Sequence, residues 1–350
     1  MRLGVLDVGS NTVHLLVADA HRGAHPIPMT SEKTALRLSE RIGAAGRLSD
    51  SDTDELVRTV DAARESAARL GCADVVAFAT SAIREADNAA EVLARVHAET
   101  GVGLDVLSGE DEARFTFLAA RRWYGWSAGK LLLLDIGGGS LEMAIGLDEQ
   151  PELAASLPLG AGRLARSKLP QDPPDRSDVR ALREWLDEQL ADTAAHFDKV
   201  GRPDRAVATS KTFRTLARLT DAAPPSSGSR ARRTLTDTGL RQLLSCITRM
   251  SSADLAELDG VSSARAHQLV SGALVAEATM RALSLEELDI CPWALREGVI
   301  LRRLDHANGD DHAAMPPGMS HPVMTGGTRS GQQADERTGR KAQHGARWNR

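Results

Sequence analysis

Apolar residues recur along the chain in two alternating patterns. Short runs rich in Leu, Val and Ile predict strands, and the almost uncharged run at residues 74–80 predicts a strand buried on both faces. Between these runs, apolar residues spaced three or four apart predict helices, as in the segment that ends near residue 69. Because strands alternate with helices, the pattern indicates an α/β architecture.

The predicted elements fill most of the first 305 residues. Strands are predicted at residues 3–8, 13–18, 74–80, 104–107, 130–135, 141–147 and 205–209. Helices are predicted up to about residue 69, at 88–100, 109–123 and 177–197, from 212, and at 236–249, 263–282 and 293–304. The stretch after residue 18, which contains Lys33 and Arg37, is interpreted as a connector.

One local pattern occurs twice in the chain. Asp7-Val-Gly-Ser and Asp135-Ile-Gly-Gly each place an aspartate at the end of a predicted strand, then a Gly-rich turn, then a second strand. Two copies indicate an internal duplication with one copy per domain. The domains are predicted at residues 1–125 and 126–291, and the almost apolar-free residues 306–350 predict a disordered tail.

Composition narrows the class of protein. The 350 residues are 42% hydrophobic and 26% charged, as expected for a soluble two-domain chain. A net charge of −5 argues against a nucleic-acid-coating surface, and no apolar run approaches the ~20 residues that span a membrane. Cys72, Cys246 and Cys291 lack metal-ligand spacing, which predicts buried free thiols in a reducing cytoplasm, and no secretory signal is expected.

The two Gly-rich turns are candidate phosphate sites. Glycine lets the backbone approach an anion closely, so that consecutive amides can point at one phosphate, and neighbouring hydroxyls add donors. A single such turn is more often a plain hairpin turn, but two matching copies facing one cleft favour anion binding. The candidate residues are Gly9, Ser10, Asn11 and Thr12 in the first turn and Gly137, Gly138, Gly139 and Ser140 in the second.

Acidic residues near these turns are candidates for metal binding and catalysis. Asp7 and Asp135 could hold a divalent cation that bridges to phosphate, as hard oxygen ligands hold Mg²⁺. The acidic trio at residues 110–112 opens a predicted helix, where acids are favoured by the helix dipole, but one of them could face the cleft and activate water. Strand alternation places Glu142 on the same face as Ser140.

Basic residues identify an anion-binding site less clearly than the Gly-rich turns do. Arg84 follows a buried strand, where loops of α/β sheets collect ligands, although a lone arginine is more often an ion-pair partner. The same alternative holds for Lys33, Arg163, Lys211 and Arg296. Residues 209–212 (TSKT) open a helix and form a plausible anion site, but they lack the GxxxxGK spacing of a P-loop.

Taken together, these segments resemble a known family. The motifs occur in the order DVGSNT at 7–12, ATSAIREA at 79–86, SGEDEAR at 108–114, DIGGGSLE at 135–142, LPLGAGR at 157–163 and REG at 296–298. This combination is similar to the exopolyphosphatase/guanosine-pentaphosphatase (Ppx/GppA) family of the actin-like ATPase superfamily. The resemblance covers about residues 1–305.

The resemblance implies two ribonuclease-H-like domains with the active site in the cleft between them. It implies Mg²⁺-dependent hydrolysis of a terminal phosphoanhydride, and a last helix, about residues 292–305, that packs back on the first domain. Glu112 matches the catalytic base, and Asp135 and Glu142 match acidic residues that position metal and water. The two Gly-rich turns match the phosphate loops, and Arg84 matches a phosphate-binding arginine.

The substrate is left open between two polyanions. Inorganic polyphosphate is the first expectation and guanosine pentaphosphate (pppGpp) the second, because both branches of the family share these motifs. The chain resembles a short form without the additional HD-type C-terminal domain, and the resemblance implies a homodimer. A nucleotide-binding sensor of the actin/Hsp70 type is the alternative from another class, since such proteins share the two Asp-Gly hairpins. A sugar kinase fits less well, because nothing marks a sugar pocket.

Overall fold

The computed structural model describes residues 1–21, 23–42, 46–220, 222–223, 225–228 and 231–306. The predicted tail at 306–350 therefore lies, apart from its first residue, outside the described residues. None of the described helices is both long and apolar enough to cross a membrane.

The first half of the chain builds a five-stranded sheet in the order β3-β2-β1-β4-β5. β1 pairs antiparallel with β2, β2 antiparallel with β3, and the parallel pairs β1–β4 and β4–β5 complete the sheet. All six residues of β4 are buried, as its uncharged sequence predicted. The strands are β1 (Arg2–Val8), β2 (Thr12–Asp19), β3 (Ile27–Ala35), β4 (Asp74–Ala79) and β5 (Asp105–Val106).

The second half repeats this topology. Its six-stranded sheet has the order β10-β11-β9-β6-β7-β8, in which β6, β7, β8, β9 and β11 take the places of β1 to β5. The predicted duplication is therefore visible in the strand order and direction. These strands are β6 (Leu131–Ile136), β7 (Leu141–Gly146), β8 (Leu153–Leu157), β9 (Arg205–Ala208), β10 (Thr234–Thr236) and β11 (Glu287–Ile290).

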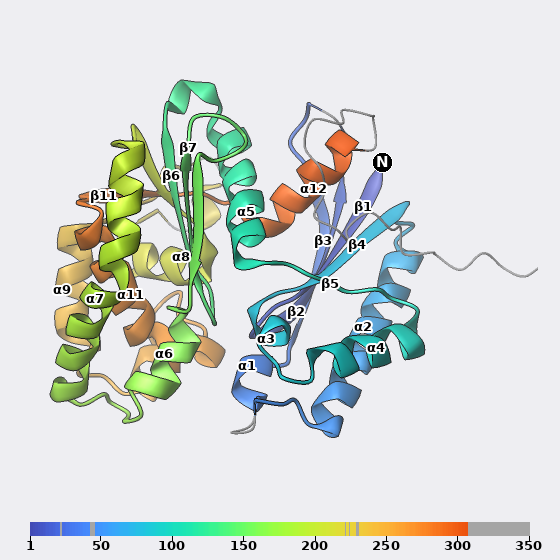
Figure 1. Ribbon diagram of the computed structural model, residues 1–350, viewed down its shortest axis with the longest axis horizontal. Coiled ribbons are helices and arrows are strands. Elements are labelled where there is room, and N and C mark those ends of the chain that lie inside the picture. The colour runs from blue at the N-terminus through green and yellow to red at the C-terminus, as the bar shows by residue number, and fades with distance from the viewer. Residues whose placement is uncertain (22, 43–45, 221, 224, 229–230, 307–350) are drawn as a thin grey trace, which may run out of the picture.

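Helices cover both sheets (Figure 1). In the first half they are α1 (Leu38–Arg41), α2 (Asp50–Arg69), α3 (Ser81–Arg84), α4 (Ala89–Thr100) and α5 (Gly109–Tyr124), followed by η1 (Trp126–Ala128). In the second half they are α6 (Ala161–Lys168), α7 (Arg176–Val200), α8 (Ser210–Leu219), η2 (Pro225–Ser227), α9 (Asp237–Ile247), α10 (Ser252–Ala256), η3 (Ser263–Gln268), α11 (Leu269–Ala282) and α12 (Leu295–His306).

Two helices, α5 and α12, lie between the sheets (Figure 1). Val299 and Ile300 of α12 share an apolar core with the first sheet, whereas Ala113 and Phe117 of α5 share another with the second sheet. The helices touch backbone to backbone, because a Cβ on Gly298 would lie 1.9 Å from the carbonyl oxygen of Phe115. This crossing fixes how the two halves of the chain face each other.

Several predictions of local structure were wrong or incomplete. The connector assigned to the stretch around Lys33 contains the edge strand β3, whose residues are almost all exposed and so show no apolar alternation. The helix predicted at 263–282 begins as the 3₁₀ segment η3, and α12 begins two residues later than predicted. Strands β8, β10 and β11 and the helix α6 had no prediction. Cys72 and Cys291 are buried as expected, but Cys246 is exposed.

Candidate active site

The first Gly-rich turn joins β1 to β2, and backbone hydrogen bonds from residues 36–39 hold it in place. The carbonyl of Ser10 accepts a hydrogen bond from the Ser39 amide at 3.0 Å, and the carbonyl of Asn11 accepts from the amides of Leu36 and Arg37 at 3.1 and 2.9 Å. In a trans peptide the amide of the next residue points opposite to the carbonyl. The amides of this turn therefore face away from the segment that holds it.

The second Gly-rich turn, between β6 and β7, is held in the same way by the start of α6. The carbonyls of Gly137, Gly138 and Gly139 accept from the amides of Ala161, Arg163 and Gly160, at 3.0, 2.9 and 3.2 Å respectively. Among the described residues, nothing accepts a hydrogen bond from the amides of residues 138–140. Three consecutive amides that point away from α6 form the kind of concavity that binds an anion.

The two turns face each other across the cleft. A Cβ on Gly138 would lie 3.0 Å from the side-chain nitrogen of Asn11, and one on Gly139 would lie 2.5 Å from the Ser81 hydroxyl. The Ser10 and Ser81 hydroxyls are 2.8 Å apart. The structure therefore brings together the two predicted phosphate loops, and a side chain at Gly139 would displace the Ser81 hydroxyl.

The structure separates the three acids of residues 110–112. Ser108 caps the start of α5, because its hydroxyl accepts from the Asp111 amide at 3.1 Å and donates to the Asp111 carboxylate at 2.7 Å. Glu110 is exposed and pairs with Arg114 at 3.0 Å. Glu112 alone is buried, with 8% of its surface exposed. Helical spacing turns it toward the cleft, which identifies it as the acid that faces the loops.

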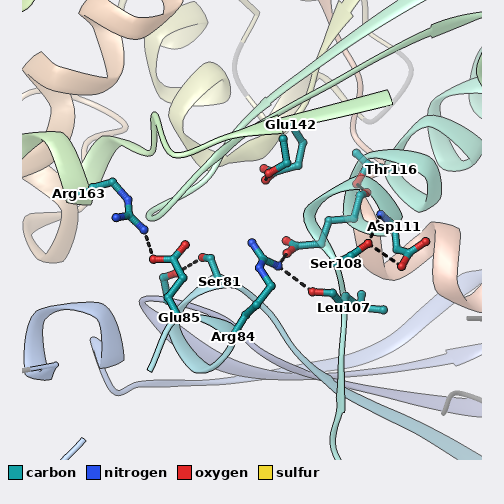
Figure 2. A network of polar contacts seen from close by, with 12 residues as sticks. Ser81, Arg84, Glu85, Leu107, Ser108, Asp111, Thr116, Glu142 and Arg163 are labelled. Atoms are coloured by element: carbon teal, nitrogen blue, oxygen red, sulfur yellow. Dashed lines mark hydrogen bonds and ion pairs between the residues drawn. The ribbon is translucent and has the colours of Figure 1, made fainter. Parts of the chain in front are cut away.

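Glu112 is paired with the predicted phosphate-binding arginine, Arg84, which is labelled in Figure 2. Arg84, at the end of α3, donates from Nη1 to Oε1 of Glu112 at 2.5 Å and to the Leu107 carbonyl at 2.7 Å. Burial and the nearby Glu142 raise the pKa of Glu112 well above its ordinary value, although Arg84 opposes the shift. Two residues with separate predicted roles thus form one ion pair.

Glu142 and Asp135 are cross-strand neighbours on β7 and β6. Oε1 of Glu142 accepts from the Ser156 hydroxyl at 3.0 Å, and Oδ2 of Asp135 accepts from the Thr209 hydroxyl at 2.5 Å. Burial and Asp135 raise the pKa of Glu142 to about 7, while Ser140 and Ser156 oppose the shift. Burial also raises the pKa of Asp135. Thr209, from the segment considered as an anion site, therefore holds Asp135 in place.

Asp7 is paired with an arginine from the far end of the chain. Arg296 of α12 donates from Nη1 to Oδ2 of Asp7 at 2.7 Å, and burial nevertheless raises the pKa of Asp7. The cross-strand partner of Asp7 is His14, in the place that Glu142 holds opposite Asp135. His14 is buried and lies 2.7 Å from the Ser31 hydroxyl, and burial lowers its pKa to about 3. The sequence analysis missed His14, although alignment of the two repeats places it at the position that corresponds to Glu142.

Asp7 and Asp135 could hold a hard divalent cation, which would stabilise their ionised forms. Four carboxyls have raised pKa values: the buried Asp7, Glu112 and Glu142 and the half-buried Asp135. Oδ1 of Asp7 and Oδ1 of Asp135 have no hydrogen-bond partner among the described residues. Within that part of the chain no three His, Cys, Asp or Glu side chains form a metal cluster. Mg²⁺ suits such a site, because it commonly takes one or two carboxylates and completes its shell with water and substrate phosphates.

The raised pKa values predict how stability depends on pH. A carboxyl whose pKa is higher in the folded than in the unfolded protein stabilises the fold fully below about pH 4.3 and loses that effect as the pH rises through its folded value. For Glu142 that value is about 7. In EDTA, we therefore expect the midpoint of thermal unfolding to fall between pH 5.5 and 8, and Glu142→Gln to flatten this slope. An equally steep slope in the variant would contradict the assignment.

A cavity of 440 Å³ opens beside these residues, and its walls include Arg84, Ser140 and Ser156. A larger cavity of 630 Å³ lies at the opposite ends of the second-sheet strands, near Arg205 and Asp289. Those two residues form an ion pair with each other at 3.2 Å. Of these two cavities, the smaller one therefore borders Arg84 and the second Gly-rich turn.

Comparisons with known proteins agree with this arrangement. The model of the Ppx/GppA phosphatase family matches residues 16–307. The chain is 62% identical over 305 residues to exopolyphosphatase 1 of Mycobacterium tuberculosis, an alignment that covers 87% of this chain and 89% of that protein.

Solved structures show the same fold. A crystal structure of the Aquifex aeolicus Ppx/GppA family member has a TM-score of 0.74 and 26% identity, covering 88% of this chain and 99% of that one. An exopolyphosphatase from Cytophaga hutchinsonii has a TM-score of 0.78 and 25% identity, covering 87% and 98% of the two chains. The predicted actin-like architecture is thereby confirmed.

Proposed function

Because the chain belongs to the Ppx/GppA phosphatase family, we propose that it is an exopolyphosphatase that hydrolyses the terminal phosphoanhydride of inorganic polyphosphate and releases orthophosphate. The observation that carries this proposal is the buried Glu112, held by Arg84 beside two opposed loops whose free amides can cradle a phosphoryl group. A water attacking the terminal phosphorus needs a base and a charge-compensating cradle of this kind.

The Arg84–Glu112 pair suggests how the base is released. The Arg84 guanidinium lies 2.5 Å from the Glu112 carboxylate and neutralises it. A terminal phosphoryl group in the cradle competes for the guanidinium, because phosphate oxygens are strong acceptors for arginine. Glu112 then loses its counterion and accepts the proton from the attacking water. Glu142, beside Ser140 and Ser156, orients that water.

We propose Mg²⁺ as the cofactor, held by Asp7 and Asp135. When bound, it would neutralise charge on the phosphates and so help the displacement. Arg296 and Thr209 each occupy one oxygen of these carboxylates and so orient the other toward the cleft. With one oxygen from each carboxylate, a bound Mg²⁺ would still take water and phosphate oxygens as further ligands.

Basic residues on one side of the cleft support a polyanionic substrate. Lys33 of β3 is not paired with any described acid. Its side chain is exposed to solvent, and partial desolvation together with nearby positive charges lowers its pKa. Those neighbours come from three different elements of the fold: Lys211 and Arg214 of α8, Arg265 of η3 and Arg296 of α12. Such a concentration of cations in a protein with a net charge of −5 favours a substrate with several negative charges.

The competing substrate is pppGpp, which presents the same terminal anhydride. The test is phosphate release by the purified protein with short-chain polyphosphate, long-chain polyphosphate and pppGpp in parallel. We expect the highest kcat/KM with polyphosphate. Faster hydrolysis of pppGpp would assign the chain to the nucleotide branch, and tight ATP binding without turnover of any of the three would support the nucleotide-sensor alternative.

A binding measurement tests the cation site without turnover. We expect Mg²⁺ with inorganic phosphate to raise the midpoint of thermal unfolding, because a ligand at a hundredfold excess over its Kd stabilises by about 2.7 kcal/mol. Asp135→Asn should abolish the increment that Mg²⁺ adds to phosphate alone. An undiminished increment in this variant would show that Asp135 does not bind the cation.

The cytoplasmic location and the homodimer remain predictions from the sequence.

A further inference from the structure

Arg163, on the first turn of α6, connects the two halves of the chain across the cleft (Figure 2). Its Nε donates to the carbonyl of Gly139 at 2.9 Å, and its Nη2 forms an ion pair with the carboxylate of Glu85. Gly139 belongs to the second phosphate loop, whereas Glu85 directly follows Arg84 at the end of α3. One planar guanidinium therefore touches the loop on one side and the arginine-bearing segment on the other.

The groups at both ends of this connection belong to the candidate active site. On the side of the second sheet, the backbone amide of Arg163 also holds the Gly138 carbonyl at 2.9 Å. On the side of the first sheet, Arg84 is bound to Glu112 at 2.5 Å. The contacts run without a break from the loop through Arg163 and Glu85 to the segment that places Arg84 against the base.

We propose that Arg163 is a positioning residue that sets the spacing between the second phosphate loop and Arg84. This inference rests on the proposed function, since it concerns the same phosphoryl site. The guanidinium of Arg163 donates to the Gly139 carbonyl and pairs with the Glu85 carboxylate. Because both partners are acceptors within the protein, Arg163 links two segments of the chain to each other. Lysine cannot reproduce the connection, because it lacks the planar fork that reaches both acceptors at once.

The Arg163–Glu85 ion pair is expected to affect the alignment of the active-site groups more than the stability of the fold. The side chains of Arg163 and Glu85 are 34% and 39% exposed, and ion pairs with this exposure add little to the stability of a fold. By contrast, displacing a catalytic group by ~1 Å can cost ~10²-fold in rate. Removal of the connection should therefore change turnover far more than unfolding.

The chain offers a matched control on the same helix. Arg166, one turn further along α6, also reaches the first half of the chain, where its Nη1 lies 3.5 Å from the Ser39 hydroxyl. It makes no hydrogen bond to residues 137–140 within the described structure. Arg166→Ala therefore removes a contact between the halves but leaves the loop connection intact.

The test compares Arg163→Gln, Glu85→Gln, the double variant and Arg166→Ala with short-chain polyphosphate. We expect Arg163→Gln to lower kcat by about 10- to 100-fold with KM nearly unchanged, and Arg166→Ala to match the wild type. The double variant should be no slower than Arg163→Gln alone, because the two residues act through one connection. Unfolding midpoints should stay close to that of the wild type in all four variants.

Three outcomes would overturn the proposal. They are an unchanged kcat in Arg163→Gln, a raised KM at unchanged kcat (direct substrate binding by Arg163), and multiplicative losses in the double variant. Hydrogen exchange gives a readout without turnover: the amides of residues 160, 161 and 163, which donate to the loop carbonyls, should exchange faster in Arg163→Gln than in Arg166→Ala. If the wild type fails to hydrolyse polyphosphate, the proposed function fails, and equal exchange in both variants would refute the role of Arg163 separately.

Discussion

Replacing Glu112 with alanine is expected to lower kcat on polyphosphate by about 10²–10⁴-fold, the usual range for loss of a general base. The residue is buried beside Arg84 at 2.5 Å, and its pKa is raised by burial and by Glu142, so it is suited to hold a proton taken from water. Removal of an acid with a raised pKa does not weaken the fold at neutral pH, since its ionised form is the unfavourable one there. The unfolding midpoint at pH 8 should therefore be equal to or above that of the wild type.

Glu110→Ala is the matched control for this experiment. Glu110 lies on the same helical turn but is exposed, where it pairs with Arg114 at 3.0 Å. Its replacement should leave kcat close to the wild-type value. A near-normal rate in Glu112→Ala, or an equal loss in both variants, would refute Glu112 as the base.

Gly298→Ala is expected to lower the free energy of unfolding by about 1–3 kcal/mol, the cost of adding atoms to a packed core. The added Cβ would lie 1.9 Å from the carbonyl oxygen of Phe115, so α5 and α12 must separate. Glu112 lies one turn before Phe115 on α5, and Arg296 lies two residues before Gly298 on α12. Activity should fall together with stability, because both helices carry residues of the site.

Gly103→Ala isolates the effect of crowding. A Cβ at Gly103 would meet no atom within 4 Å, so the same chemical change should alter the free energy of unfolding by no more than about 0.5 kcal/mol. Chemical denaturation of both variants measures the difference. Equal stability of Gly298→Ala and the wild type would show that the α5–α12 crossing adapts, and would weaken its role in placing Glu112.

The sequence was most informative where a local pattern repeats. The turns after Asp7 and Asp135 follow strands of the same kind, so the duplication and both turns could be predicted from the residues alone. The central strands were found because they are buried on both faces, as in β4. These features depend on residues that are close together in the sequence, so the pattern of apolar and polar residues is enough to predict them.

Contacts between distant segments could not be predicted in this way. The pairing of Arg296 with Asp7 joins residues 289 positions apart, and the Arg163–Glu85 connection joins residues 78 apart. The choice of Glu112 among three adjacent acids came from the family resemblance, because spacing alone does not tell which one is buried. Strand β3 escaped prediction because, as an exposed edge, it carries no apolar alternation.

The most direct test of the central claim is the product pattern from a polyphosphate of one defined length, incubated with Mg²⁺ and sampled during the first turnovers. Hydrolysis of the terminal anhydride predicts orthophosphate together with a chain shorter by one unit, at equal amounts in the earliest samples. Fragments from the middle of the chain, or no orthophosphate at all, would contradict the account.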